Sequence, residues 1–340
     1  MLNFVEYIVE SANSESDAKG KYHELQVGHY LSGGNLLHHR GKGMGPRDIK
    51  RGIKDVTSPE RVKAMDKHAK DTASAIHDHL SETHPHHDIH EVHWASQASD
   101  HENITGHKDP NSTADLIVAM KHKKTGKISH VGVSLKYGNS KAANLKNPGL
   151  NTLSKHAGTD FAPMSAEHNA NVKKLGIRSH THFKTFRDSS DPKKRAVADK
   201  VMQSSVNSRQ KMAKSYTKDM QKKFKGDEEG IKNHIKGMVA APTHLPEIRV
   251  QTTTHSDGMG AHEPHITSSD HISKALDSYH SIHVANHTGG TSMIIKGTHK
   301  KTGKQRVLMQ TTFHGGGKPS MPGAVGIVKA PFLTGKDQHD

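Results

Sequence analysis

The chain has 340 residues and a formal net charge of +15 at pH 7, with 49 Lys and Arg against 34 Asp and Glu, and 32 His that add positive charge as the pH falls. It contains no Cys, which excludes structural disulfides and thiolate zinc sites. No apolar run reaches the roughly 18 residues that a membrane-spanning helix needs, so we expect no membrane partner. Leu, Ile, Val and Phe together stay below the roughly 20% level under which a highly charged chain tends to disorder. Order therefore has to be inferred segment by segment.

The excess of basic residues favours a polyanionic partner. Binding to phosphates releases the counterions that surround them, which makes nucleic acid the usual partner of a basic surface. We therefore predict DNA as the partner. The alternative is that the charge serves only to keep the protein soluble.

The first residues, MLNFVEYIVESANSES, predict a short amphipathic helix over residues 1–10 and a polar linker over residues 11–21. The helix ends in the tripeptide Ile-Val-Glu and resembles the capsid-targeting peptides of internal head proteins of large tailed phages. This resemblance implies cleavage between Glu10 and Ser11 by a prohead protease. It also implies a location inside the phage virion, in the cytoplasm of the bacterial host, or both. The alternative is a terminal helix that docks on the core.

The next part of the chain predicts two helices followed by three strands. The stretch YHELQVGHYL, residues 22–31, is a helical pattern that SGG ends. Ser58, Pro59 and Glu60 form a helix start, with a hydroxyl N-cap, a proline in the first turn and an acid near the positive end of the dipole. Apolar residues then recur at helical spacing to about residue 82. Three strand-like runs follow, at 88–96, 114–120 and 127–138.

A long basic helix is predicted over residues 192–224, where one face is mainly apolar and the others carry lysines and arginines. We predict that Lys211, Lys214 and Lys218 contact DNA phosphates, although such a charged face is often only solvated. The C-terminal part then predicts strands at EIRVQTTT, YHSIHVANH, TSMIIKGT and KQRVLMQTTF.

The hexapeptide HKKTGK occurs twice, at residues 122–127 and 299–304, each time between two apolar runs. Thr-Gly-Lys suits a tight hairpin, so we expect a turn at both places. A duplicated unit is the alternative. The histidine-rich runs HPHHDIH and SHTHF lack the four-ligand spacing of zinc sites, and we expect solvated or DNA-facing histidines there.

Two strand ends in this pattern carry residues suited to catalysis. Asp115 begins the run at 114–120, and Lys136 ends the run at 127–138, with Ser134 two residues earlier on the same face. Hydrolysis of a phosphodiester needs a divalent metal, acids that hold it and a group that orients the attacking water. Because a hairpin places these strand ends side by side, they predict one edge of a metal site. The alternative is that Asp115 caps a loop and Lys136 is a surface lysine.

From residue 22 to residue 140 this arrangement resembles the PD-(D/E)XK nuclease superfamily. The core of that family is a helix, a three-stranded antiparallel unit, and then a further helix and strand. Its signature is an acid entering the second strand and acid-x-Lys at the end of the third. Asp115 matches the first acid and Lys136 the lysine, while Ser134 stands in place of the second acid, as in S-x-K variants. Glu24 on the preceding helix matches the additional helical glutamate.

The resemblance implies a metal-dependent DNA endonuclease that uses Mg²⁺ or Mn²⁺. Asp115 and Glu24 would hold the metal, Lys136 would orient or activate water, and Ser134 would assist through a hydrogen bond. If Glu24 does not supply the carboxylate that is missing at Ser134, Glu91 on the first strand is the alternative. A different class of function stays open, namely a noncatalytic, basic DNA-binding internal head protein of a phage.

The expected fold class is α+β, with a restriction-endonuclease-like core in which helices flank a mixed β-sheet. We expect a nuclease-like core at 22–190, a basic helical region at 191–240 and a β-rich C-terminal region at 241–340. These follow the targeting peptide at 1–10 and the linker at 11–21.

Overall fold

The computed structural model of the protein describes residues 15–38, 43, 58–95, 98–109, 112–138, 144–146, 149–239, 244–287, 290–314 and 325–330. The chain divides into two compact units, each built from two segments. Unit 1 takes residues 1–143 and 240–273, and unit 2 takes residues 144–239 and 274–340. The predicted helix over 1–10 and the predicted cleavage site between Glu10 and Ser11 lie outside the described residues. No helix in the described ranges is long and apolar enough to cross a membrane.

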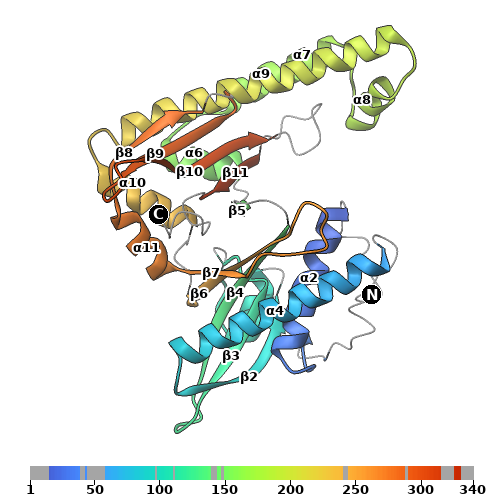
Figure 1. The fold of residues 1–340 in the computed structure, drawn as a ribbon. Helices are drawn as coiled ribbons and strands as arrows, with labels where there is room; N and C mark the ends of the chain where they lie inside the picture. The colour runs from blue at the N-terminus through green and yellow to red at the C-terminus, as the bar shows by residue number, and fades with distance from the viewer. Residues whose placement is uncertain are drawn as a thin grey trace. The chain divides into compact units, whose positions relative to one another are not determined.

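Unit 1 contains a six-stranded mixed sheet with the order β1-β2-β3-β4-β6-β7 (Figure 1). Strands β2, β3 and β4 are antiparallel neighbours, whereas β1 runs parallel to β2 and β6 runs parallel to β4. The elements that lie wholly in unit 1 are α2 (Glu15–Leu31), β1 (Leu37–His38), α4 (Pro59–Thr83), β2 (His87–Trp94), α5 (Ala98–Thr105), β3 (Leu116–His122), β4 (Ile128–Gly138), β6 (Glu247–Thr253) and β7 (His265–Ser268).

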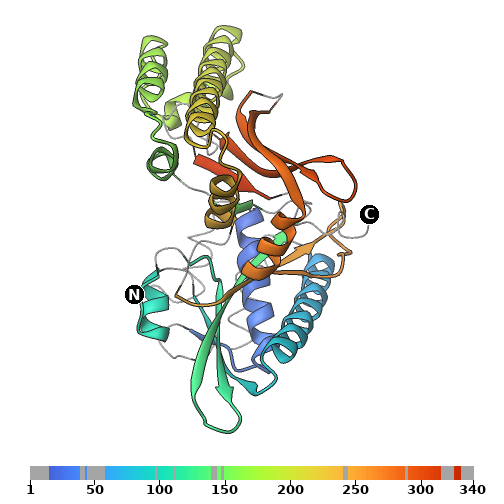
Figure 2. The ribbon, with the colours of Figure 1, turned by 90° about the vertical axis from the view of Figure 1, so that its left-hand side faces the viewer.

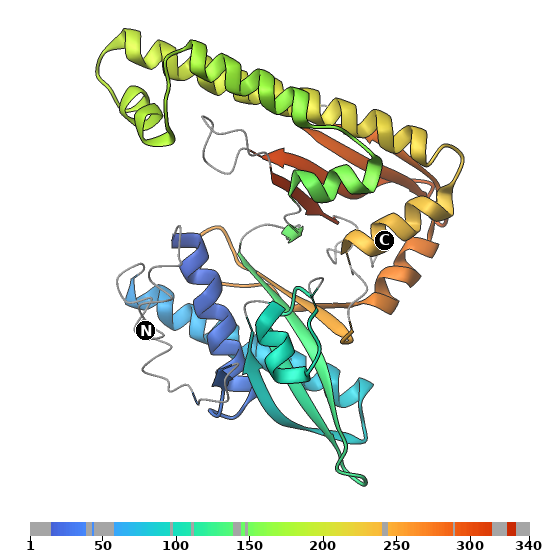
Figure 3. The ribbon, with the colours of Figure 1, turned by 180° about the vertical axis from the view of Figure 1, so that it is seen from behind.

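Helices α2 and α4 lie on one side of this sheet, and α5 lies on the other (Figures 2 and 3). Alternate residues of the strands, such as Leu116 and Val118 of β3 and Val133 and Leu135 of β4, are buried in one core with apolar residues of α2 and α4. Because side chains alternate along a strand, the remaining positions face the other side of the sheet. The apolar core therefore fixes the strand register, while the opposite face carries buried apolar residues such as Ile117 together with polar ones such as Ser134.

The expected α+β fold with a mixed sheet flanked by helices is confirmed. The helix predicted from residue 59 is α4, and Ser58 Oγ accepts a hydrogen bond from the Arg61 N–H at 3.4 Å, as an N-cap should. The predicted linker over 11–21 is wrong from residue 15 onward, because α2 already begins at Glu15.

Unit 2 combines a five-stranded antiparallel sheet, in the order β5-β11-β10-β9-β8, with a layer of helices. The long helix α9 packs against β8, β9 and β10, and Tyr216 meets Phe313 edge to face at 5.8 Å between ring centroids. Its elements are β5 (Asn144–Lys146), α6 (Leu150–Ala157), α7 (Ala162–Lys174), α8 (His180–Arg187), α9 (Pro192–Lys223), α10 (Glu228–Val239), β8 (Tyr279–Asn286), β9 (Ser292–His299), β10 (Gln305–His314) and β11 (Val325–Lys329), while α11 (Ser269–Asp277) spans the boundary between the units.

These units do not follow the linear boundaries expected from the sequence. Strand β6 falls in the expected C-terminal region but pairs with β4, so it completes the first sheet. The helices between residues 150 and 187, expected to belong to the nuclease-like core, instead pack with α9 in unit 2. Both HKKTGK segments form the expected turns, with the same hydrogen bond from the first histidine N–H to the last lysine carbonyl at 2.9 Å. Gly126 and Gly303 adopt positive φ angles of 69° and 65° in them.

Candidate active site

Asp115 is fixed at the entrance to β3 by both neighbouring strands. Its N–H donates to the Val133 carbonyl at 2.9 Å, and its own carbonyl accepts from the Ala95 N–H at 3.0 Å. Because β3 begins only at Leu116, the side chain takes over a hydrogen bond in the ladder, and Asp115 Oδ2 accepts from the Leu135 N–H at 2.6 Å. The carboxylate is therefore held by backbone contacts on a rigid sheet.

Lys136 lies beside this carboxylate, as the hairpin geometry predicted. Its Nζ is 3.5 Å from Asp115 Oδ2. The side chains are 28% and 21% exposed, respectively, so the pair is accessible from solvent but partly shielded from it. Partial shielding strengthens the interaction between charges and still lets a ligand approach. The two strand ends thus bring an acid and a cation together.

Glu24 of α2 is the third member of this cluster. Burial and, to a smaller extent, the nearby charge of Asp115 raise the pKa of its carboxyl to about 8, although the charge of Lys136 and the neighbouring Trp94 act in the opposite direction. Two carboxylates that are partly shielded from solvent repel each other, and a divalent cation bound between them would offset that repulsion. The cluster draws on α2, β3 and β4, so it exists only in the folded chain.

The carboxylate oxygens of Asp115 and Glu24 suit Mg²⁺ better than a cation whose ligands must all come from the protein. Mg²⁺ prefers oxygen ligands and is commonly held by one or two carboxylates together with water and substrate phosphates. Within the described ranges, no group of three or more His, Cys, Asp and Glu side chains has a metal-binding arrangement. Asp115 and Glu24 fit a Mg²⁺ site of this kind, in which two carboxylates hold the metal and the substrate completes the coordination.

Ser134 occupies the position beside Asp115, since Leu116 pairs with Val133 in the register of β3 and β4. The residue is only 1% exposed, and its Oγ has no hydrogen-bond partner among the described residues. It cannot replace a carboxylate as a metal ligand at neutral pH. Glu91 does not supply that acid either, because it lies opposite Ala119, four residues along β3, and pairs with His93 at 3.0 Å.

Two charged residues of β6 extend the site beyond what the sequence predicted. Glu247 pairs with Gly132 and Arg249 pairs with Ser134 in the parallel register of β4 and β6. The Glu247 carboxylate accepts hydrogen bonds from Ser112 Oγ and, at 3.3 Å, from a backbone N–H two residues before Asp115. The alternation of charged and apolar residues in EIRV was visible in the sequence, but nothing local indicated that this strand pairs with β4.

We expect the substitution Glu24→Gln to stabilise the protein at neutral and mildly alkaline pH. Because the folded state raises the pKa of Glu24 above its usual value near 4.5, folding favours the protonated form. The contribution of this residue is therefore complete at acidic pH and is lost as the pH rises toward 8. An amide is neutral throughout and avoids that loss.

Thermal unfolding at a series of pH values checks this expectation. The melting temperature of Glu24→Gln should exceed that of wild type near pH 8, and the two should converge near pH 4.5. A constant difference across this range would mean that Glu24 is not perturbed in the folded state.

No protein-family model and no curated protein sequence matches the chain. Among solved structures, the crystal structure of restriction endonuclease MspI in complex with its cognate DNA is similar over 94% of each chain, at 11% sequence identity and a TM-score of 0.38. A similarity of this size does not bear on function, which has to be argued from the residues of the site.

Proposed function

We propose that this protein is a metal-dependent deoxyribonuclease of the PD-(D/E)XK type, in its S-x-K variant, that hydrolyses phosphodiester bonds of DNA. The observation that carries the proposal is the 3.5 Å approach of Lys136 Nζ to Asp115 Oδ2 at the ends of adjacent strands, with the acid Glu24 within electrostatic reach. These are the groups that metal-assisted hydrolysis requires. Cleavage of supercoiled plasmid with Mg²⁺ or Mn²⁺ tests it.

Each residue has a stated role in this proposal. Asp115 and Glu24 would hold Mg²⁺, which when bound would supply Lewis-acid stabilisation of the charge that develops on the phosphate. Lys136 donates a hydrogen bond to the attacking water and stabilises its deprotonated form. Ser134 assists through a hydrogen bond from its hydroxyl, which has no partner among the described residues. The sheet holds Asp115 and Lys136 in place, so little reorganisation is needed when substrate binds.

The location of this activity is proposed from the sequence. The resemblance of residues 1–10 to capsid-targeting peptides favours a phage-encoded protein that is packaged in the virion and delivered with the genome. Processing between Glu10 and Ser11 would then remove the peptide.

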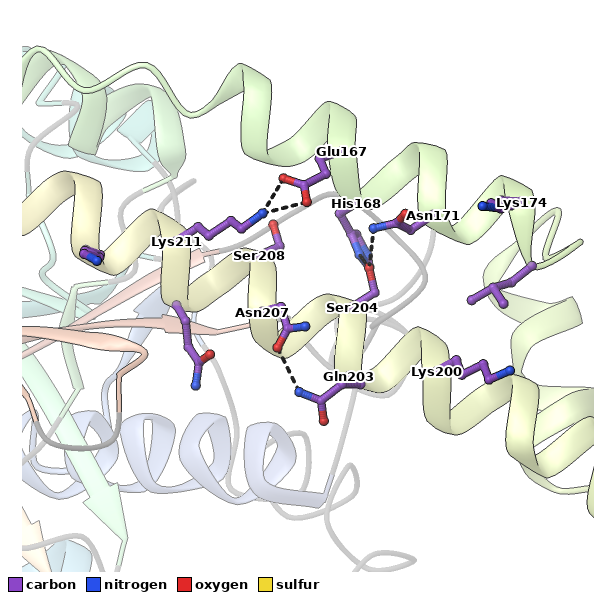
Figure 4. Close-up of a pocket in the computed structure, with 13 residues that line it drawn as sticks. Glu167, His168, Asn171, Lys174, Lys200, Gln203, Ser204, Asn207, Ser208 and Lys211 are labelled. Carbon is purple, nitrogen blue, oxygen red and sulfur yellow. Dashed lines mark hydrogen bonds and ion pairs between the residues drawn. The ribbon is translucent and has the colours of Figure 1, made fainter.

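The DNA-contacting surface of unit 2 is proposed to lie along α9. Lys214 and Lys218 are exposed and have no acidic partner within the described residues, whereas Lys211 Nζ pairs with both oxygens of Glu167 on α7, at 2.6 and 2.7 Å (Figure 4). A pocket of about 640 Å³ lies between these helices, and Lys174 and Lys200 also line it. Among the described residues that line this pocket, Glu167 is the only acid, so a polyanion would meet mainly positive charge there.

We predict salt-sensitive, largely sequence-independent binding of DNA, in which Lys214 and Lys218 each account for about 0.9 of the slope of log affinity against log salt. Lys214→Glu and Lys218→Glu should flatten that slope. Lys211→Ala should have a smaller effect, because Glu167 already offsets its charge. Glu167→Gln should increase affinity by releasing Lys211.

Binding isotherms measured at several salt concentrations check these expectations. Wild-type affinity that does not change with salt would remove DNA as the partner. A slope that is unchanged in both Lys214→Glu and Lys218→Glu would place the contact elsewhere on the chain.

A further inference from the structure

Arg249 is a half-buried cation whose role in the fold is unexplained. Burial lowers the pKa of its guanidinium to about 10, so it still carries its charge at neutral pH. Buried cations in proteins are normally paired with an acid or saturated with hydrogen bonds. Yet in the described part of the chain Arg249 Nε has no hydrogen-bond partner, and no carboxylate lies within ion-pair distance of this side chain. The charges of Glu247 and Asp115 only influence it from further away.

The register of three strands places Arg249 in the candidate active site. Ser134 pairs with Arg249 across β4 and β6, and Asp115 lies on the other side of Ser134, at the entrance to β3. Neighbouring strands are about 4.8 Å apart, so the row spans roughly 10 Å between its outer backbones. Paired residues of parallel strands point to the same side of a sheet, and the long side chain of Arg249 therefore lies over the same side as Ser134.

Two unsatisfied donors thus lie side by side next to the acid and lysine of the site. The Ser134 hydroxyl and the Arg249 Nε–H are both buried and both lack a partner among the described residues. Leaving one buried donor unsatisfied costs about 1–3 kcal/mol. Two such donors in one row indicate that a ligand with acceptor oxygens belongs there.

Phosphate is the ligand chemistry that matches these donors. The planar guanidinium presents a fixed fork of N–H groups that fits two oxygens of one phosphate, and a hydroxyl adds a third hydrogen bond. A carboxylate ligand could also accept these hydrogen bonds, and any anion would have to approach Asp115 and Glu247. A phosphodiester is favoured because it is also the substrate of the proposed reaction.

We infer that Arg249 and Ser134 form a phosphate-binding subsite that holds a phosphodiester oxygen of DNA beside Asp115 and Lys136. The choice of DNA as the source of that phosphate rests on the proposed function. Arg249 acts here as a binding and positioning residue, since it neither holds the metal nor activates water. Its charge also offsets that of the two acids nearby until substrate arrives.

Binding of a short fluorescein-labelled DNA duplex, measured by anisotropy in EDTA at several salt concentrations, tests the subsite without metal or cleavage. Arg249→Gln should weaken binding about tenfold, as expected for loss of charge-assisted hydrogen bonds, and should lower the salt slope by about 1. The DNA affinity of Arg249→Lys should fall between those of wild type and Arg249→Gln, because lysine keeps the charge and loses the fork of N–H groups. Ser134→Ala should weaken binding two- to threefold, by about one neutral hydrogen bond.

Arg209→Gln is the matched control. Arg209 is also half-buried and its pKa is also lowered by burial, but its Nε donates to the Ser205 carbonyl at 3.2 Å. It lies on the side of α9 opposite Lys214 and Lys218, and so away from the DNA-contacting surface proposed for that helix. The substitution removes the same charge and should change DNA affinity by less than twofold. Equal losses in Arg209→Gln and Arg249→Gln would overturn the subsite, because they would reflect net charge alone.

The remaining outcomes are also decisive. If Arg249→Gln fails to fold, wild-type affinity in Arg249→Lys overturns the inference and weakened affinity supports it. If inorganic phosphate raises the melting temperature of wild type and not of Arg249→Gln, while DNA affinity is equal in both, the ligand is free phosphate and the assignment to DNA is wrong. A protein that binds DNA through Arg249 but cleaves none with any metal retains the subsite and loses the proposed function.

Discussion

Asp115→Asn and Lys136→Ala are each expected to lower the rate of DNA cleavage by roughly 10³-fold or more. Loss of the Asp115 charge weakens metal binding and with it the stabilisation of the transition state. Loss of Lys136 leaves the attacking water poorly oriented. Since each 1.36 kcal/mol of lost transition-state stabilisation is a tenfold change in rate, either effect reaches this size by removing about 4 kcal/mol.

Both substitutions should leave the fold intact, and this makes the kinetic result interpretable. Asparagine keeps an oxygen that accepts from the Leu135 N–H, the contact that closes the start of β3. The Lys136 side chain is 28% exposed and belongs to no apolar cluster. Lys121→Ala, at the far end of the same hairpin, is the matched control and should retain wild-type activity.

Single-turnover cleavage across a range of Mg²⁺ concentrations separates the two roles. Asp115→Asn should require more metal, whereas Lys136→Ala should bind metal as tightly as wild type and still react slowly. If Lys136→Ala cleaves at the wild-type rate, the lysine is a structural partner of Asp115 and has no part in the chemistry.

Trp94→Ala is expected to destabilise the protein by about 3–5 kcal/mol, the usual cost of emptying a large buried aromatic site. The indole is 1% exposed and lies in the core that α2 and α4 form with the first sheet. The indole also influences the pKa of the Glu24 carboxyl, so its loss affects the candidate site as well. Trp94→Phe should cost less, because it keeps most of the ring volume.

Urea unfolding followed by circular dichroism gives these differences in the free energy of unfolding. The wild-type transition should also appear in tryptophan fluorescence, because Trp94 is the only tryptophan. Equal unfolding midpoints for wild type and Trp94→Ala would contradict the packing of this core.

Elements with local signals were predicted well from the sequence. Helix α4 starts where the Ser58 cap, Pro59 and Glu60 indicated, and both HKKTGK turns close as hairpins. The hairpin of β3 and β4 then follows from its turn and its alternating apolar residues, and it brings Asp115 to Lys136. These features depend on residues that are near one another in the sequence.

Features that depend on distant residues were not predictable in the same way. The parallel pairing of β6 with β4 joins segments more than a hundred residues apart, so Arg249 and Glu247 gave no sign that they belong beside Ser134. The early start of α2 at Glu15 was hidden by serines and glycine, which favour loops in isolation. Tertiary packing of this helix on the sheet overrides that preference.

Cleavage of supercoiled plasmid by wild type and Asp115→Asn, purified in parallel and assayed with Mg²⁺, with Mn²⁺ and with EDTA, tests the central claim most directly. We expect wild type to cleave with at least one of the metals and not with EDTA, and Asp115→Asn to be inactive in all three conditions while binding the plasmid as tightly as wild type. Activity that persists in Asp115→Asn, or wild type that cleaves with neither metal, would contradict the nuclease assignment and favour a basic DNA-binding head protein.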